Sequence, residues 1–354
     1  MELDDKQKEI VYSNSPYILV AAGAGSGKTR CITERLRYIL EQGVDSKNIY
    51  AITYTNAAAE EMRSRLPKDL NCFIGTIHSL ANRILIQNGY DTSWEIQSEN
   101  FDLLFKKIQD NIHNISLPKV EYLLIDEFQD ICDNEYKFIF NILLPEKFFA
   151  VGDAAQSIYS FKGSNYHYFM NLVEDPEVDV YELNYNYRSG RSIIDFAENF
   201  IYSCDDIYFV PNECKTNTYG NVQQMTFSID NLVEEVQDYY YNYKDIFILV
   251  RKNQEITEIK NILDKCHIPN DTFKKSDLDS GELQNMMNKD SVKILTVHSA
   301  KGLEAKKVII LGLNAWSNEE KRVCYVAATR AKEALVWYNK KPKRKSKGKM
   351  ISWD

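Results

Sequence analysis

The chain has 354 residues, of which 44% are hydrophobic and 27% charged, and its formal net charge is −8. This length predicts two domains of ordinary size, each able to bury a core. The polar, acidic start MELDDKQKE argues against a secretory or transit peptide, and no apolar run is long enough to cross a bilayer. We therefore expect a cytoplasmic protein with no membrane partner.

The cysteines and the charge distribution bear on the kinds of site and partner that the protein can have. The seven cysteines are scattered without a C-x-x-C pair, which is typical of reduced thiols and favours neither disulfides nor a zinc site. The net negative charge argues against nucleic acid as a partner. However, residues 340–349, KKPKRKSKGK, are strongly basic. Either a local groove and this tail contact phosphates, or the protein does not bind nucleic acid.

The first motif in the chain is the glycine-rich stretch AAGAGSGKTR, residues 21–30. It follows the apolar run YILV and precedes CITERLRYIL, whose apolar residues recur at helical spacing. A strand, a glycine turn and a helix in this order indicate a phosphate-binding loop, in which backbone N–H groups point at an anion. Lys28 would reach the β- and γ-phosphates of ATP, and Thr29 would hold Mg²⁺. The predicted cradle comprises Ala22, where the strict pattern has glycine, and Gly23, Ala24, Gly25, Ser26, Gly27, Lys28 and Thr29.

Short apolar runs then alternate with helical stretches. Segments that begin as strands cover residues 49–53, 73–76, 122–130 and 147–164, followed by 246–250, 292–296, 307–312 and 334–338. Residues 81–120 have the pattern of a small helical insertion, and residues 179–190 are expected to begin a second sheet. The alternation predicts parallel α/β architecture throughout.

Acidic residues end one of these strands abruptly. In YLLIDEFQD, residues 122–130, the apolar run stops at Asp126 and Glu127. Ligands of α/β sheets bind at the carboxyl ends of parallel strands. Asp126 would hold Mg²⁺ through water and Glu127 would polarise the attacking water. The alternative is an acidic surface turn.

Taken together, the motifs resemble the UvrD/Rep/PcrA-type superfamily 1A DNA helicases from Leu3 to about Leu335. They are LDDKQ, AGAGSGKTR, AITYTNAAAEEM, GTIHSL, DEFQD, GDAAQSIYSFKG, NYRSG, TVHSAKGLE and YVAATRAKEAL, in the order of that family. The resemblance implies two RecA-like lobes with the nucleotide between them. It also implies that adenine is read by Gln7, flanked by Arg30 and stacked on Tyr187, while Glu304 meets the ribose. Gln156, Arg188 and Arg330 would contact the γ-phosphate.

The same resemblance implies a path for single-stranded DNA. Its residues would be Tyr54, Thr55, Thr76, His78, Tyr159, Phe161, Lys162, His298 and Ser299. Base stacking on aromatic side chains tolerates any sequence, which suits movement along a strand. Two positions depart from the family. Ala57 replaces a usual lysine, and Lys162 replaces an arginine, which keeps the charge but loses the planar fork.

The expected organisation is a compact motor. Residues 1–178 would form the first lobe, with 81–120 as a reduced insertion, and residues 179–339 the second, with 251–291 as a minimal remnant of a second insertion. Residues 340–354 would be a basic tail. Two arginines from the second lobe would stabilise the transferring phosphoryl group only when the cleft closes.

This organisation predicts an ATP-dependent helicase or translocase that moves 3′ to 5′ on single-stranded DNA, with contacts to duplex junctions and an accessory protein left open. Two alternatives remain. One is a DNA-stimulated ATPase switch that signals to a partner protein in repair or phage defence. The other is a scaffold that has lost hydrolysis, against which the complete set of motif residues counts.

Overall fold

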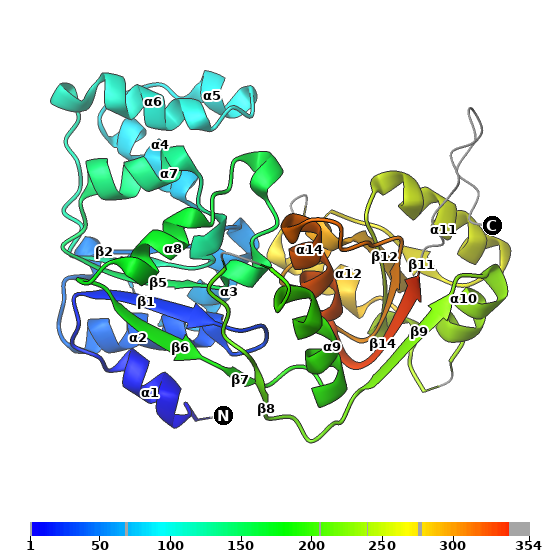
Figure 1. Cartoon of the computed structure of the whole chain (residues 1–354). Coiled ribbons are helices and arrows are strands. Elements are labelled where there is room, and N and C mark those ends of the chain that lie inside the picture. The colour runs from blue at the N-terminus through cyan, green and yellow to red at the C-terminus, as the bar shows by residue number, and fades with distance from the viewer. Residues whose placement is uncertain (1, 68–69, 205–206, 239, 275–277, 340–354) are drawn as a thin grey trace. The chain divides into compact units, whose positions relative to one another are not determined.

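The structure is a computed structural model that describes residues 2–67, 70–204, 207–238, 240–274 and 278–339 (Figure 1). The chain divides into two compact units. Unit 1 runs to Asn184 and also includes Tyr208–Val210, and unit 2 comprises Tyr185–Ile207 and the chain from Pro211 on. The basic tail expected at 340–354 lies outside the described residues.

Unit 1 is built on a six-stranded parallel sheet with the order β3-β2-β4-β5-β1-β6. Its strands are β1 (Tyr17–Ala22), β2 (Ile49–Ile52), β3 (Phe73–Gly75), β4 (Tyr122–Ile125), β5 (Lys147–Gly152) and β6 (Asp179–Leu183). The strands in the middle of the sheet are almost continuously apolar because helices cover both faces of a parallel sheet. One core cluster joins β1 to α2 through Ile18, Val20 and Leu36.

The helices of unit 1 begin at residues that suit their first turns. They are α1 (Asp5–Val11), α2 (Lys28–Glu41), α3 (Asn56–Ser64), α4 (Ile77–Gln87), α5 (Ser93–Gln97), α6 (Asp102–Asp110), α7 (Asp133–Lys137) and α8 (His167–Glu174), and Phe138–Leu143 continue α7 as a π-helix. Asp4, Thr55 and Thr76 cap α1, α3 and α4 with their side-chain oxygens. The stretch expected to be a helical insertion contains the end of α4 together with α5 and α6, which lie away from the sheet at the top of Figure 1.

Unit 2 repeats the architecture with a second six-stranded parallel sheet, ordered β11-β12-β10-β13-β14-β9. Its strands are β9 (Asn221–Thr226), β10 (Ile246–Val250), β11 (Asn270–Asp271), β12 (Val292–Thr296), β13 (Ala305–Leu311) and β14 (Ala331–Asn339), and β7 (Tyr185–Asn186) pairs with β8 (Glu213–Cys214) in a separate ribbon. Its helices are α9 (Arg191–Ile201), α10 (Ile229–Val236), α11 (Asn253–Lys265), α12 (Ser280–Asn288), α13 (Val297–Ala300) and α14 (Asn318–Ala328). The α/β class with two parallel sheets, consistent with two RecA-like lobes, is confirmed.

One expected sheet assignment is wrong. Residues 179–190 do not begin the second sheet, because β6 pairs in parallel with β1 from Ile18↔Asp179 to Ala22↔Leu183 and forms the edge of the first sheet. The chain leaves unit 1 only after Asn184. The sequence DVYEL has the mixed polarity of a half-exposed edge strand, and this pattern does not reveal which sheet the strand joins.

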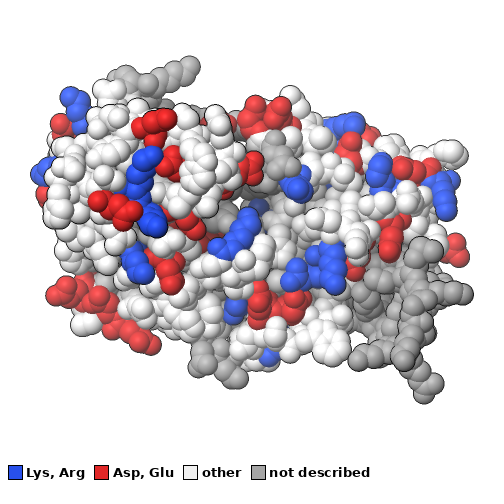
Figure 2. Space-filling model, turned by 90° about the horizontal axis from the view of Figure 1, so that it is seen from above, with Lys and Arg blue, Asp and Glu red and all other residues white. Residues whose placement is uncertain are grey.

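The distribution of surface charge and the character of the helices follow the expectations from the amino-acid composition. On the face shown in Figure 2, basic and acidic side chains are interspersed. Among the described helices, none has both the length and the apolar character that a membrane span requires.

Candidate nucleotide and DNA sites

The glycine-rich loop is folded into a compact turn between β1 and α2. Gly25 and Gly27 have φ angles of +69° and +85°, a left-handed region that favours glycine, and Gly27 is the N-cap of α2. Lys28 is the first residue of the helix, and its Nζ donates to the carbonyl of Gly23 at 3.2 Å. Ser26 Oγ donates to the same carbonyl at 2.8 Å. The lysine therefore folds back over the loop, where a phosphate-binding lysine is needed.

Two neighbouring elements support this loop. The Gly23 amide donates to the carbonyl of Leu183 at the end of β6, at 3.0 Å. On α1, the buried Gln7 donates from Nε2 to the carbonyl of Ser26 at 3.2 Å, and it also completes a capping box with Asp4. Gln7, predicted to read adenine, thus lies against the loop. Of the other cradle residues, Ala22 ends β1 and Ala24 lies in the turn, and both are buried, whereas Thr29 and the adenine-flanking Arg30 follow Lys28 in α2.

The carboxyl ends of β4 and β5 bring polar side chains together beside the loop. Glu127 has a φ of +55°, its amide donates to Asp126 Oδ1 at 2.9 Å, and its Oε2 accepts from Gln129 Nε2 at 2.5 Å. Gln129 Oε1 in turn accepts from the Asp153 amide at 2.9 Å. Gln156 Nε2 donates to Asp153 Oδ2 at 2.6 Å. Gln129 therefore connects Glu127 to the residue that positions Gln156.

Lys28 influences the pKa of two carboxylates, Asp126 and Asp153, at the carboxyl ends of β4 and β5. Burial, followed by the neighbouring Glu127, raises the pKa of Asp126, and the Lys28 ammonium opposes the rise. Burial also raises the pKa of Asp153, again opposed first by Lys28. The lysine thus acts electrostatically on both buried carboxylates. Sequence reasoning missed Gln129 and Asp153 as members of the site, although Asp153, like Asp126, follows an apolar strand directly.

The residues available for a metal suit an ion that is coordinated by few protein atoms and mostly by water and phosphate. No group of three or more His, Cys, Asp or Glu side chains in the described part of the chain could hold a metal ion. Magnesium commonly keeps several waters and binds through one or two protein oxygens and substrate phosphates. Thr29 at the start of α2 and the buried Asp126 at the end of β4 fit that pattern.

The aromatic residues predicted to contact DNA in unit 1 form one cluster. Tyr54 and Tyr159 are stacked, with ring centroids 5.2 Å apart and an interplanar angle of 14°. Phe161 lies 6.2 Å from Tyr159 and is 65% exposed, and Lys162 Nζ lies 5.1 Å from the Tyr159 ring centroid. Thr55, next to Tyr54, accepts from the Ala58 amide at 3.2 Å as the cap of α3.

The second predicted DNA motif lies at the start of α4. Thr76 Oγ1 accepts from the Ser79 amide at 3.2 Å and caps the helix. His78, in the first turn, packs against Phe101 and Phe105, with ring centroids 5.6 and 5.1 Å away. Burial lowers the pKa of His78, and Asp102 opposes this effect. Its Nδ1 lies 4.0 Å from Glu135 Oε1, a neighbour that sequence reasoning did not identify.

In unit 2, Arg188 and Glu304 form an ion pair, with Arg188 Nε donating to Glu304 Oε2 at 2.5 Å. Lys332 Nζ lies 2.5 Å from the other carboxylate oxygen. Burial alone would raise the pKa of Glu304, but Arg188 and Lys332 outweigh it and lower the pKa to about 2. Asn186 Oδ1 accepts from the Arg188 and Ser189 amides, both at 2.9 Å, and fixes the turn that carries Arg188.

Arg330 lies at the end of α14 and is only 1% exposed. Its guanidinium donates to the carbonyls of Val326 and Leu303 at 2.9 and 3.3 Å and to Thr329 Oγ1 at 3.1 Å. Because Arg188 Nη1 donates to the Thr329 carbonyl at 3.3 Å, both predicted arginines are held by the same turn.

The remaining predicted residues of unit 2 are Tyr187, which directly precedes Arg188, and His298 and Ser299. Tyr187 is 40% exposed and its ring lies edge-on to Tyr185 at 6.4 Å. His298 and Ser299 lie on the short helix α13 and are half-buried, and the Ser299 amide donates to Thr296 Oγ1 at 3.2 Å.

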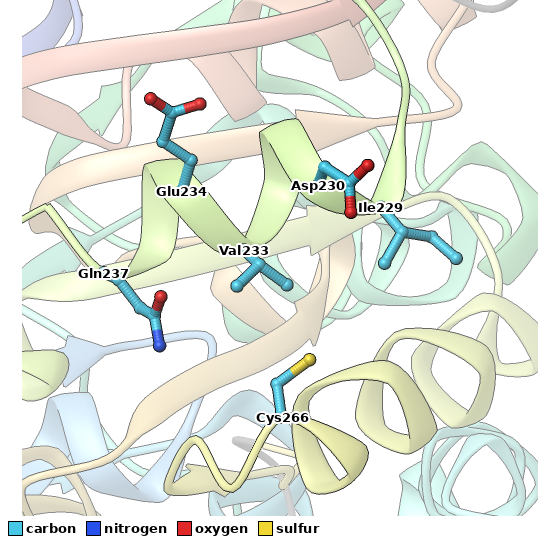
Figure 3. Close-up of a pocket in the computed structure, with 6 residues that line it drawn as sticks. All are labelled: Ile229, Asp230, Val233, Glu234, Gln237 and Cys266. Carbon is cyan, nitrogen blue, oxygen red and sulfur yellow. The ribbon is translucent and has the colours of Figure 1, made fainter.

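A hollow of about 410 Å³ lies apart from all of these residues in unit 2. As Figure 3 shows, Val233 and Gln237 point toward Cys266 at the end of α11, whereas Glu234 points away from it. It is lined by Ile229, Asp230, Val233, Glu234, Gln237 and Cys266. None of these residues belongs to a predicted site.

Comparison with known proteins finds one family profile for each half of the chain. A family profile described as "UvrD/REP helicase N-terminal domain" matches residues 3–115 and 99–177, and one described as "UvrD-like helicase C-terminal domain" matches 181–278 and 270–341. The chain is 27% identical over 75% of its length to "ATP-dependent DNA helicase PcrA" of Leuconostoc citreum, covering 49% of that protein. It is 25% identical over 94% of its length to "Probable DNA helicase" of Mycoplasma pneumoniae, covering 82%.

A third relative is "ATP-dependent DNA helicase Rep" of Buchnera aphidicola subsp. Acyrthosiphon pisum, 24% identical over 90% of the chain and 66% of that protein. The chain spans about half the length of several curated relatives that it matches. The two family profiles together cover most of the chain, from residue 3 to residue 341. Because these two profiles match nearly the whole chain, the chain belongs to the UvrD-like helicase family.

Proposed function

We propose that this chain is an ATP-dependent DNA helicase or translocase that moves 3′ to 5′ on single-stranded DNA. The observation that carries the proposal is the arrangement in unit 1. There, Lys28 folds over a glycine loop and acts on the buried carboxylates of Asp126 and Asp153. A lysine beside a loop of inward N–H groups binds phosphates, and carboxylates next to it manage a metal and a water. Membership of the helicase family supports ATP and DNA as the ligands.

Each group of unit 1 then has a role in hydrolysis. Thr29 and Asp126 would hold Mg²⁺, which neutralises charge that develops on the phosphates. Glu127 orients the attacking water, and its hydrogen bond from Gln129 holds the carboxylate in place. Gln156 contacts the γ-phosphate, and Gln7 and Arg30 bind the adenine.

Unit 2 contributes positive charge and the rest of the nucleotide site. Arg188 and Arg330 stabilise the transferring phosphoryl group, Tyr187 stacks on adenine and Glu304 binds the ribose. Because Glu304 already pairs with Arg188 and Lys332, Arg188 must exchange one anion for another when it reaches the phosphate. We propose that closure of the cleft between the two lobes, divided after Asn184 rather than after residue 178, supplies this exchange and couples hydrolysis to movement.

DNA binding is assigned to side chains of both units. Tyr54, Tyr159 and Phe161 stack on bases, and Lys162 supplies positive charge beside them. Thr55, Thr76, His78, His298 and Ser299 lie along the backbone of the strand. We further propose that 81–120 and 251–291 take the place of larger insertions, so that the chain works as a near-minimal motor.

Phosphate release tests the enzymatic part. Wild type is expected to release phosphate faster when single-stranded DNA is present. Lys28→Ala should lower the rate about 10²-fold or more, because a preorganised charge on the phosphates is lost. Glu127→Gln should keep ATP binding but lose turnover. A rate that DNA does not change would contradict the proposal.

Unwinding of tailed duplexes tests direction. Duplexes with a 3′ tail should be separated in an ATP-dependent reaction, and the same duplexes with a 5′ tail should not. Separation of the 5′-tailed substrate alone would overturn the assigned direction, whereas DNA-stimulated hydrolysis without separation of either would restrict the protein to translocation.

A further inference from the structure

A buried acidic side chain lies next to one of the predicted DNA residues without belonging to any recognised motif. Glu135 is the third residue of α7 and is 9% exposed. Its Oε2 accepts from the Cys132 amide at 2.9 Å, so one oxygen of the carboxylate caps the helix. The other oxygen, Oε1, lies 4.0 Å from Nδ1 of His78. A single carboxylate thus connects the start of α7 to the start of α4.

His78 is placed where an anion would meet a positive helix end. It lies in the first turn of the 11-residue helix α4, and its side chain is 33% exposed, so a ligand can approach it. Phe101 and Phe105 pack against the ring on one side. The first turn of a helix favours a phosphate, and a protonated imidazole favours it further.

We propose that Glu135 is a positioning residue for His78: its carboxylate orients the imidazole and favours the protonated ring when His78 faces a phosphate of the bound strand. This inference rests on the proposed function, in which His78 lies along DNA. An imidazolium between two anions is stabilised by both of them, so Glu135 and the phosphate act together. DNA affinity should then rise as pH falls through the titration of His78.

Three further titratable groups, Asp102, Cys132 and Tyr54, lie around the pair. Burial lowers the pKa of His78, and Asp102 on α6 counteracts it. Burial raises the pKa of Glu135, with Cys132 hydrogen bonds opposing and Asp102 adding to the rise. Burial, with Glu135 second, raises the pKa of Cys132 to about 12, so that group stays a neutral thiol. Tyr54 also faces this cluster, and burial raises its phenol pKa, so it too stays neutral.

The substitution Glu135→Gln separates charge from shape. Gln keeps the length of the side chain and an oxygen that can accept from the Cys132 amide, but it loses the negative charge. Glu135→Asp keeps the charge and shortens the side chain. A purely structural role as helix cap predicts that Gln resembles wild type and Asp does not, whereas the proposed role predicts the reverse for every property that depends on His78.

The matched control is Glu255→Gln in unit 2. Glu255 is also buried and is also the third residue of its helix, α11, where its carboxylate accepts from the Arg251 and Lys252 amides at 2.9 Å. It therefore tests the loss of a buried capping carboxylate at a helix that carries none of the predicted site residues.

The first measurement is an NMR titration of the histidine side chains in the free protein, with the His78 signal assigned by its loss in His78→Gln. Glu135→Gln should lower the His78 pKa by about one pH unit, as expected when an opposite charge at about 4 Å is removed. Glu135→Asp and Glu255→Gln should leave it close to the wild-type value. An unchanged His78 pKa in Glu135→Gln overturns the inference.

The second measurement is binding of a fluorescent oligothymidine strand between pH 5.5 and 8.5. Wild-type affinity should increase several-fold toward low pH, the midpoint should move down by about one pH unit in Glu135→Gln, and His78→Gln should flatten the profile. A midpoint that does not move contradicts the inference. If wild type binds no strand at any pH, the proposed function fails, and the NMR titration still decides whether Glu135 controls His78.

Discussion

Two arginines to which the sequence assigns the same task have different surroundings in the structure. Arg188 is held by the carboxylate of Glu304, and its side chain is partly exposed. Arg330 is almost fully buried and donates to backbone carbonyls of Val326 and Leu303. A residue that satisfies buried carbonyls supports the fold, whatever else it does, because an unpaired buried polar group is costly.

Replacement of these arginines by alanine should therefore give different losses of stability. Arg330→Ala is expected to lower the free energy of unfolding by about 2–3 kcal/mol, because it leaves a cavity and unpaired carbonyls. Arg188→Ala should change it by less than about 1 kcal/mol, since a partly exposed ion pair contributes little. Urea denaturation of both variants measures this. Equal losses would mean that the buried bonds of Arg330 do not support unit 2.

The carboxylate of Glu304 predicts a dependence of stability on pH. Its pKa of about 2 in the folded state is below the ordinary value near 4.5. A lowered pKa stabilises the fold fully above the unfolded value, and this contribution is lost as pH falls from about 5 toward 2. The difference in unfolding free energy between wild type and Glu304→Gln should shrink over that range. A difference that stays constant down to pH 2 would show that Arg188 and Lys332 do not hold the charge.

At this scale, sequence reasoning finds residues that stand next to a strong local signal. Lys28 follows a glycine turn, and Asp126 follows an apolar strand, so both could be predicted as site residues from the sequence. Gln129 and Glu135 are not, because their importance comes from partners far along the chain: the Asp153 amide lies 24 residues from Gln129, and His78 lies 57 residues before Glu135. Local patterns do not encode such pairs.

At the scale of elements, the edge strands carry more of the architecture than their sequences suggest. β6 completes the first sheet beside β1, and its last carbonyl accepts from Gly23 in the glycine-rich loop. In unit 2, β9 has the polar sequence NVQQMT and was not predicted as a strand, yet it pairs with β14 at the edge of the second sheet. Buried central strands were predictable from continuous apolar runs, whereas the edge strands β6 and β9 lack that signal because part of each remains exposed.

The position of β6 predicts how unit 1 can be isolated. A fragment of residues 1–184 contains the whole first sheet, but a fragment of residues 1–178 lacks its edge strand and the carbonyl that holds Gly23. The longer fragment should unfold more cooperatively in urea and bind a fluorescent ATP analogue more tightly. If both fragments behave alike in the two assays, β6 does not support the loop.

A close approach of two glycines fixes the start of α9. A Cβ on Gly190 would lie 2.5 Å from the backbone nitrogen of Gly220, a distance that the backbone cannot accept without moving. Gly190→Ala should therefore lower the unfolding free energy by about 1–3 kcal/mol, as overpacking does. Gly281→Ala, in α12 with ordinary contacts around its Cβ, should raise stability by about 0.4–1 kcal/mol. Thermal unfolding of the two variants measures both, and a stable Gly190→Ala would contradict the contact.

At the scale of the whole molecule, residues 1–339 carry a net negative charge, whereas the C-terminal segment 340–349 carries a net positive charge. The chain carries −8 overall, yet residues 340–349 are strongly basic. Deletion of residues 340–354 should weaken binding of single-stranded DNA and flatten the slope of log affinity against log salt, because fewer counterions are released. Titrations at several salt concentrations measure the slope. A slope that the deletion does not alter would remove the tail from the binding surface.

The last residue of β6 and the residue after it connect the glycine-rich loop to the boundary between the two units. Leu183 accepts from Gly23, and the side chain of Asn184 accepts from Lys6 on α1 at 2.8 Å, on the helix whose Gln7 lies against Ser26. The next residue, Tyr185, already belongs to unit 2. Tension along the peptide chain at this junction would therefore act directly on the two hydrogen-bonded supports of the glycine-rich loop, which are the Leu183 carbonyl and helix α1.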